Sequence, residues 1–175
     1  MNIRNSSTGN ITVDGISAAN SNNATTVNLA TASASSVSFS NNASTVQALG
    51  VDAGNGIKEG ENITTGSTSS LDAESNEDGS GDFHNSAGTF TTGGNTLSIT
   101  ANDFSLSGAI NTGSGTAKIF VSDAGTIGLG STSANMTISG NELGNITAGT
   151  LTIGDSTAGA MKVNDGSYTH LTLPT

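Results

Sequence analysis

Residues 95–130 read NTLSITANDFSLSGAINTGSGTAKIFVSDAGTIGLG, and this stretch decides the fold. Apolar residues alternate in it with small or polar ones, as in Leu97-Ser-Ile99 and Phe104-Ser-Leu106. Such alternation places the apolar residues on one face of a β-strand, so the stretch predicts short, half-buried strands. Glycine, asparagine and aspartate separate the strands, as is typical of turns. Helical periodicity is limited to a single turn at residues 141–146.

The same pattern continues to residue 163. The further apolar pairs are Ile119-Phe-Val121, in which Phe120 is an exception to the alternation, Ile127-Gly-Leu129, Met136-Thr-Ile138, Leu151-Thr-Ile153 and Met161-Lys-Val163. The pairs recur at a similar distance along the chain, from Leu97 to Ile119, Phe104 to Ile127, Ile127 to Leu151 and Met136 to Met161. A period of about 22–25 residues is typical of one coil of a solenoid. We therefore expect an all-β, right-handed parallel β-helix of about seven coils; a β-sandwich is the alternative.

The composition agrees with a thin, repeated core. Hydrophobic residues make up 33% of the 175 residues, aromatic ones 3% and charged ones 10%, whereas globular domains have about 45–50% apolar and about 25% charged residues. Disorder usually needs high charge and many prolines, but the chain has one proline and sparse charge. Stacked coils, each with few large side chains, are the solution that this composition favours.

The charges exclude several classes of partner. The net charge is −10, and the four basic residues, Arg4, Lys58, Lys118 and Lys162, are scattered. Nucleic acids need clustered lysine and arginine, and anionic membranes repel an acidic chain, so neither is expected as a partner. No run of about 20 apolar residues is present, so membrane insertion is not expected either. The absence of cysteine suits an exported protein, and because Met1–Asn5 lack a signal sequence, we expect an internal piece of a longer one.

Three regions differ in regularity. Residues 1–94 predict irregular solenoid coils, with strands such as Ile11-Thr-Val13, and residues 95–166 predict regular ones. Residues 167–175 hold the single proline and the single tyrosine of the chain. This tail resembles translated sequencing-adapter read-through, and we expect it to be non-native and outside the fold.

A family resemblance rests on residues 95–165. The segments that carry it are Leu97–Asp103, Leu106–Gly115, Thr126–Gly130, Ile138–Leu143, Ile146–Asp155 and Gly159–Val163. They resemble the β-strand repeats of filamentous-haemagglutinin-like and autotransporter-adhesin-like bacterial proteins; residues 1–94 match in composition only. The resemblance implies a secreted rod at the cell surface, associated with the outer membrane. It also implies adhesion to host or neighbouring cells and their glycans, and contact with the rest of the protein's own solenoid.

The expected function is therefore structural and adhesive rather than enzymatic, and no cofactor is expected. The alternative is a carbohydrate-binding or carbohydrate-active β-helix module. Polysaccharide lyases need basic groups that stabilise developing negative charge, and hydrolases need paired carboxylates. Asp103, Asp123 and Asp155 each follow a predicted strand, where turns normally carry aspartate. His84 has no evident catalytic partner in the sequence and is interpreted as an exposed turn histidine.

An acidic turn at residues 76–82 is the one candidate metal site. Asn76, Asp78, Ser80 and Asp82 place side-chain oxygens at alternate positions around glycines. Calcium prefers six to eight oxygen ligands, but the distal bidentate glutamate of a calcium loop is missing, so the site is predicted to be weak at best and a plain polar turn is the alternative. A second, looser acidic patch consists of Asp52, Asn55, Glu59 and Glu61, and it is interpreted as a solvated loop.

Overall fold

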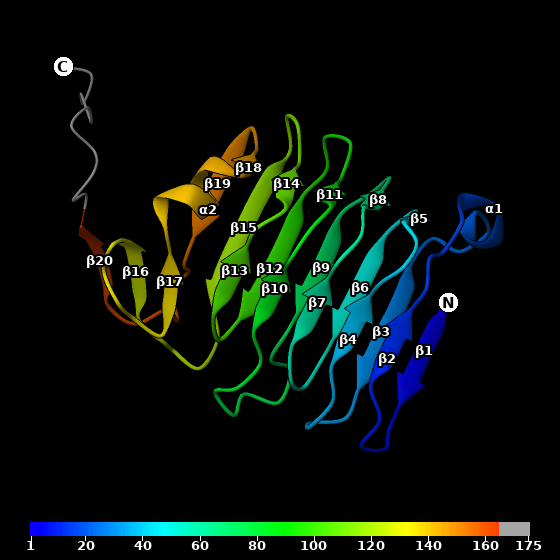
Figure 1. Cartoon of the computed structure of the whole chain (residues 1–175), viewed down its shortest axis with the longest axis horizontal. Helices are drawn as coiled ribbons and strands as arrows, with labels where there is room; N and C mark the ends of the chain where they lie inside the picture. The colour runs from blue at the N-terminus through cyan, green and yellow to red at the C-terminus, as the bar shows by residue number, and fades with distance from the viewer. Residues whose placement is uncertain (165–175) are drawn as a thin grey trace.

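The chain winds into a stack of coils, shown in the computed structural model for residues 1–164 (Figure 1). Every strand pairing among these residues is parallel. Parallel neighbours need a crossover rather than a tight hairpin. Consecutive strands therefore lie in different sheets, apart from Ile127–Gly130 and Met136–Ile138, which pair in one sheet, and the chain returns to each sheet after about one coil. The expected all-β parallel β-helix is confirmed, and the β-sandwich is not the fold.

Sheet 1 spans the length of the stack. Its seven strands in spatial order are β1 (Asn2–Asn5), β3 (Val27–Thr31), β6 (Leu49–Asp52), β9 (Ser69–Asp72), β12 (Leu97–Ala101), β15 (Thr116–Val121) and β19 (Thr150–Ile153). Each coil contributes one strand to this sheet, so residues 1–164 make six complete coils and begin a seventh, close to the roughly seven that the sequence predicts. At about 4.8 Å between neighbouring strands, the seven strands extend for about 30 Å.

The other faces of the solenoid carry shorter sheets. Sheet 2 contains β13 (Phe104–Leu106), β10 (Phe83–Asn85), β7 (Ile57–Glu59), β4 (Val37–Phe39) and β2 (Ile11–Val13). Sheet 3 contains β18 (Ile146–Thr147), β14 (Ala109–Asn111), β11 (Thr89–Thr91), β8 (Ile63–Thr65) and β5 (Ser44–Val46). Sheet 4 contains β17 (Met136–Ile138), β16 (Ile127–Gly130) and β20 (Met161–Asn164). In the first coil a short helix, α1 (Ala18–Ser21), packs against β5.

The coils differ in length, which a single expected period does not capture. Gly50 of β6 pairs with Ser70, but Ser69 of β9 pairs with Leu97, so the coil that begins at β9 is longer than the one before it. The extra residues of this coil form the loop at residues 73–82 between sheets 1 and 2. The coil after β15 is longer still, because Thr116 pairs with Thr150. Insertions at the corners therefore lengthen coils while the strands keep their register.

The register corrects all four of the pairings that the spacing suggests. Leu151 pairs with Ala117, and Met136 pairs with Ile127. Ile119 pairs with Ile99 rather than with Leu97, so β12 and β15 are neighbours as expected but are shifted by two residues. Phe104 pairs with Phe83 and not with Ile127. Ile127 pairs instead with both Met136 and Met161, because β16 lies between β17 and β20. The sequence period averaged over coils of unequal length and so misplaced these partners.

The core is a narrow column of inward-facing side chains. Most strands of three residues bury the first and third residue and turn the second one outward, as in β13. Phe83, Phe90 and Phe104 are the largest fully buried side chains, and the rings of Phe83 and Phe104 stack with centroids 5.4 Å apart. Each fully buried large apolar side chain contributes about 1.5–3 kcal/mol. The alternation predicted from the sequence therefore builds the core.

Sheet 4 continues the stack of sheet 2 through side chains. The carboxylate of Asp103 accepts a hydrogen bond from the Thr137 N–H (3.0 Å), and Glu142 Oε1 accepts one from the Leu106 N–H (3.1 Å). Glu142 also forms the capping box of α2 (Gly140–Gly144) with Ser139, so the helical turn expected at residues 141–146 is present there. Helix α2 thus closes the edge of β13 at Leu106.

Sheets 1, 2 and 3 contain strands from both predicted regions, 1–94 and 95–166. Across their boundary at residue 94, β9 pairs with β12 over four residues. The division into irregular and regular coils stays a prediction, and the proposed non-native tail at residues 167–175 lies outside the described residues.

Candidate functional site

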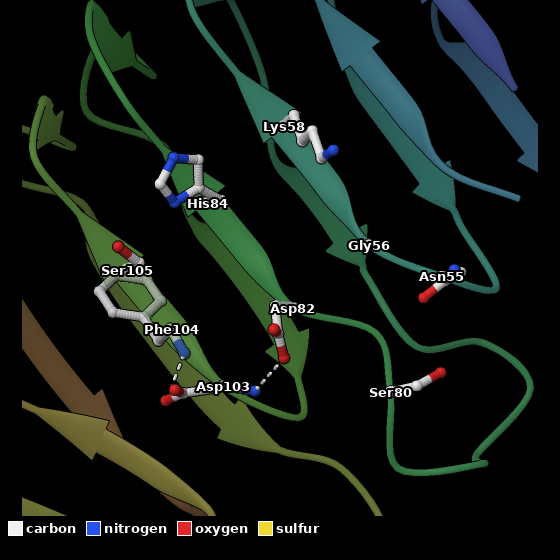
Figure 2. Close-up of a pocket in the computed structure, with 9 residues that line it drawn as sticks. All are labelled: Asn55, Gly56, Lys58, Ser80, Asp82, His84, Asp103, Phe104 and Ser105. Carbon is white, nitrogen blue, oxygen red and sulfur yellow. Dashed lines mark hydrogen bonds between the residues drawn. The ribbon is translucent and has the colours of Figure 1, made fainter.

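A polar pocket of about 380 Å³ lies on the outer face of sheet 2. It is lined by Asn55, Gly56, Lys58, Ser80, Asp82, His84, Asp103, Phe104 and Ser105 (Figure 2). Three adjacent strands, β7, β10 and β13, supply its floor, and the loop at residues 73–82 supplies Ser80 at its side. The pocket therefore depends on the lengthened fourth coil.

A row of polar side chains crosses the floor of the pocket. Lys58 and His84 are register partners, and His84 and Ser105 are partners in turn. They point outward because their neighbours in the strand, such as Phe83 and Asn85, point into the core. His84 is exposed as predicted, but it lies in the middle of a strand rather than in a turn. Hydrogen bonds among the nine residues of Figure 2 involve neither Lys58 nor His84.

Two carboxylates border this row, and one oxygen of each accepts hydrogen bonds from neighbouring residues of the fold. Asp82 Oδ1 accepts hydrogen bonds from the Asp103 N–H (3.1 Å) and from Asn102 Nδ2 (3.3 Å). Asp103 Oδ1 accepts from the N–H groups of Phe104 (2.8 Å) and Thr137 (3.0 Å). The second oxygen of each carboxylate takes no part in these bonds. The pocket thus offers donors from Lys58 and His84 beside carboxylate acceptors, a set that suits a ligand rich in hydroxyl groups.

The predicted calcium ligands are brought together only in part. The side chains of Asn76 and Ser80 both donate hydrogen bonds to the carboxylate of Asp78, the former at 2.7 Å. These bonds, that from Ser80 above all, lower the pKa of Asp78. Asp82 instead points toward the next coil, where it binds Asp103. Three of the four residues therefore lie together and the fourth belongs to the pocket.

Glu74 is a member of this region that the sequence did not single out. Its side chain is buried, and its two oxygens accept hydrogen bonds from the Ser80 N–H (2.9 Å) and the Ser122 hydroxyl (2.6 Å). The second bond joins the loop to a residue 48 positions away, so no local signal could have revealed it. Glu74 fastens the base of the acidic loop to the sixth coil.

Further carboxylates surround the loop. Partial burial raises the pKa of Asp72, and the charges of Asp52, Glu74 and Glu77 raise it further. Desolvation and the charges of Glu74 and Glu77 also raise the pKa of Asp123. Even so, no three histidine, aspartate or glutamate side chains within residues 1–164 converge as metal ligands would. The calcium site stays a prediction.

In the second predicted acidic patch, the expectation of solvent exposure is wrong for Glu59. Glu59 is 1% exposed and points into the core, whereas we expected it in a solvated loop. Its period-2 spacing from Ile57, which is also buried, was the available signal. Asp52 and Asn55 are exposed, as expected for that patch, and Asn55 borders the pocket.

Comparisons with known proteins do not identify a family for this chain. No protein-family model matches it, and searches of curated proteins and of solved structures find no significant match.

Among the residues that the structure describes, neither helix has the length and apolar character needed to cross a membrane.

Proposed function

We propose that the chain is a non-catalytic shaft segment of a large secreted bacterial surface protein, an adhesin of the filamentous-haemagglutinin-like type. The observation that supports this most directly is sheet 1, a parallel sheet with one strand from each of seven coils. A ladder that runs along the stack resists bending and leaves few exposed backbone groups within it for proteases.

The ends of the stack support a segment within a longer solenoid. Within residues 1–164, the exposed large apolar side chains are Met1, Ile3, Leu151, Met161 and Val163, all in the first and last coils. In the interior coils the equivalent rows are buried, as with Leu29, the partner of Ile3. Further coils on either side would cover these residues, as capping or neighbouring repeats do in solenoids.

Adhesion of coated beads tests this proposal. Beads that carry the chain should adhere to cultured epithelial or bacterial cells more strongly than beads that carry the chain with Ile99→Asp, a substitution expected to unfold the middle coils. Protease resistance of the folded chain should accompany adhesion. Equal adhesion by both preparations, or rapid cleavage between β3 and β15, would contradict a stiff adhesive shaft.

A second candidate function is carbohydrate binding at the pocket on sheet 2. It is favoured by the row of Lys58 and His84 beside the carboxylates of Asp82 and Asp103, because sugar hydroxyls both donate and accept hydrogen bonds. Phe104, the aromatic residue of the pocket, is 1% exposed, so recognition would rest on hydrogen bonds rather than on stacking against a ring.

Binding to immobilised oligosaccharides separates this candidate from the shaft. Lys58→Ala with His84→Ala should weaken binding at least about tenfold, because a lost charge-assisted hydrogen bond costs about 1.5–3 kcal/mol. Lys118→Ala is the matched control, since Lys118 points outward from β15 in sheet 1. If both variants bind equally, the pocket is not the binding site, and the shaft proposal is unaffected.

A further inference from the structure

The central coils contain one pair of polar side chains in an apolar row. Sheet 2 turns Phe39, Glu59, Asn85 and Leu106 inward at consecutive register positions. Glu59 is 1% exposed and Asn85 is wholly buried. The two therefore lie on adjacent strands, β7 and β10, in the core between a phenylalanine and a leucine.

The polar atoms of these two side chains are unsatisfied in the part of the chain that the structure describes. Within residues 1–164, neither carboxyl oxygen of Glu59 nor either amide atom of Asn85 has a hydrogen-bond partner. Lys58 and His84, the other charged or titratable groups of these two strands, lie on the outer face. The other strands that pack against β7 and β10 are β4 and β13 in sheet 2 and β12 in sheet 1, and none of the three has a titratable residue. No positive charge on these strands compensates an ionised Glu59.

The protonated acid fits this position better than the anion does. A carboxylate that is removed from water without a counter-charge is strongly disfavoured, so burial favours the neutral form. Burial raises the pKa of Glu59 to about 8, although the adjacent Asn85 amide lowers it somewhat. A neutral carboxyl group has an O–H to donate to the amide oxygen and a carbonyl oxygen to accept from the amide N–H.

We propose that Glu59 and Asn85 form a proton-operated lock in the middle of the rod. When Glu59 is protonated, the acid and the amide satisfy each other across β7 and β10 with a small adjustment of their side chains. When Glu59 loses its proton to solvent, the Asn85 N–H can still donate to it, but the Asn85 amide oxygen loses its donor and the buried charge has no counter-charge, so the coil pair is weakened. This goes beyond a shaft function, because it makes the strength of the shaft depend on pH.

The direction of the dependence follows from linkage. The folded chain keeps a proton on Glu59 up to about pH 8, whereas the unfolded chain releases it near the ordinary value of 4.5. Between these two values unfolding releases one proton, so the unfolding constant rises about tenfold per pH unit. The contribution of the lock is complete below the lower value and is lost as the pH rises through the upper one.

Thermal melting between pH 5 and pH 9, followed by far-UV circular dichroism, tests the lock. Glu59→Gln keeps the shape but cannot ionise, so it should remove this slope and melt at a higher temperature than the wild type near pH 9. Glu61→Gln, two residues along and outside the strand, is the control and should keep the wild-type slope. Parallel pH profiles for Glu59→Gln and the wild type would overturn the proposal.

A direct titration covers the case in which Glu59→Gln does not fold. Carbon-13 NMR of the glutamate carboxyl groups in the wild-type chain should show one signal that titrates near pH 8. Titration of every glutamate signal in the ordinary acidic range would overturn the proposal without any variant.

Discussion

The middle coils and the last coil carry the same sequence pattern but reach different burial. Leu97, Ala117 and Leu151 occupy one row of sheet 1, and they are 1%, 2% and 38% exposed. Val163, on the last strand of sheet 4, is 68% exposed. A residue in a middle coil is covered by a coil on each side, whereas a residue in the last coil is covered on one side. Burial in this molecule is therefore a property of stacking and not of the strand alone.

The largest expected effect on stability comes from placing a charge in one row of sheet 1, either in a middle coil or in the last coil. Ile99→Asp puts an unpaired carboxylate into a site that is 1% exposed, and we expect a loss of about 3–5 kcal/mol in the free energy of unfolding. Ile153→Asp lies on the last strand of sheet 1, where the side chain is only partly buried, and should cost clearly less. Denaturant unfolding measures both, and equal losses would mean that the last coil is covered as well as the middle ones.

Removing an apolar side chain should destabilise a middle coil far more than the last coil, with a difference similar to that for the charge. Phe83 is wholly buried and stacks on Phe104, so Phe83→Ala should cost about 3–5 kcal/mol. Val163→Ala removes a mostly exposed side chain and should stay within about 0.5 kcal/mol of the wild type. Melting curves of the two variants check this; a large loss from Val163→Ala would contradict the open last coil.

Two glycines differ in the space around their backbone, one between packed coils and one in the exposed helix α2. A methyl group on Gly108, between β13 and β14, would collide with the carbonyl of Gly88 and approach the carbonyl carbon of Ala87 at 2.9 Å. Gly108→Ala should therefore cost about 1–3 kcal/mol. Gly144 in α2 has nothing within 4 Å of such a methyl group, so Gly144→Ala should gain about 0.4–1 kcal/mol. Opposite signs in denaturant unfolding are the expected outcome.

The last prediction concerns calcium. If the turn at residues 76–82 binds the ion, calcium at ten times its dissociation constant stabilises the chain by about 1.4 kcal/mol. Asp78→Asn should abolish that rise in melting temperature. Asp155→Asn is the control, because Asp155 is an exposed carboxylate of the last coil whose pKa is likewise lowered by a side-chain hydrogen bond, from Thr157. An identical response in the absence of Asp78 would exclude this turn as the site.

The sequence reveals the parts of the fold that repeat locally. Alternation identified the inward residues of β12 and β13, and the number of coils followed from their spacing. The strand register could not be predicted from the sequence. The loop at residues 73–82 and the segment between β16 and β18 lengthen their coils, and the sequence pattern of the strands does not reveal this. A mean period cannot locate partners when the step from β6 to β9 is short and the step from β9 to β12 is long.

The candidate site was predictable to a smaller extent. Lys58, His84 and Ser105 belong to three successive coils and become neighbours only through the register. Glu74 depends on Ser122, which lies in another coil. Glu59 is different, because its spacing from Ile57 already placed it inside, and only its charge argued for the surface.

The unequal coils have an evolutionary consequence. Sheet 1 accepts the long step from β9 to β12 directly between two shorter steps with unbroken pairing, since the added residues leave the solenoid at a corner. A loop at that corner can then be lengthened, shortened or exchanged while the shaft stays intact. The loop also borders the pocket on sheet 2, so such exchanges would alter the surface offered to a ligand and leave the core unchanged. The architecture thus separates the loop residues, which can be substituted freely, from the inward-facing residues of the strands, which the core requires.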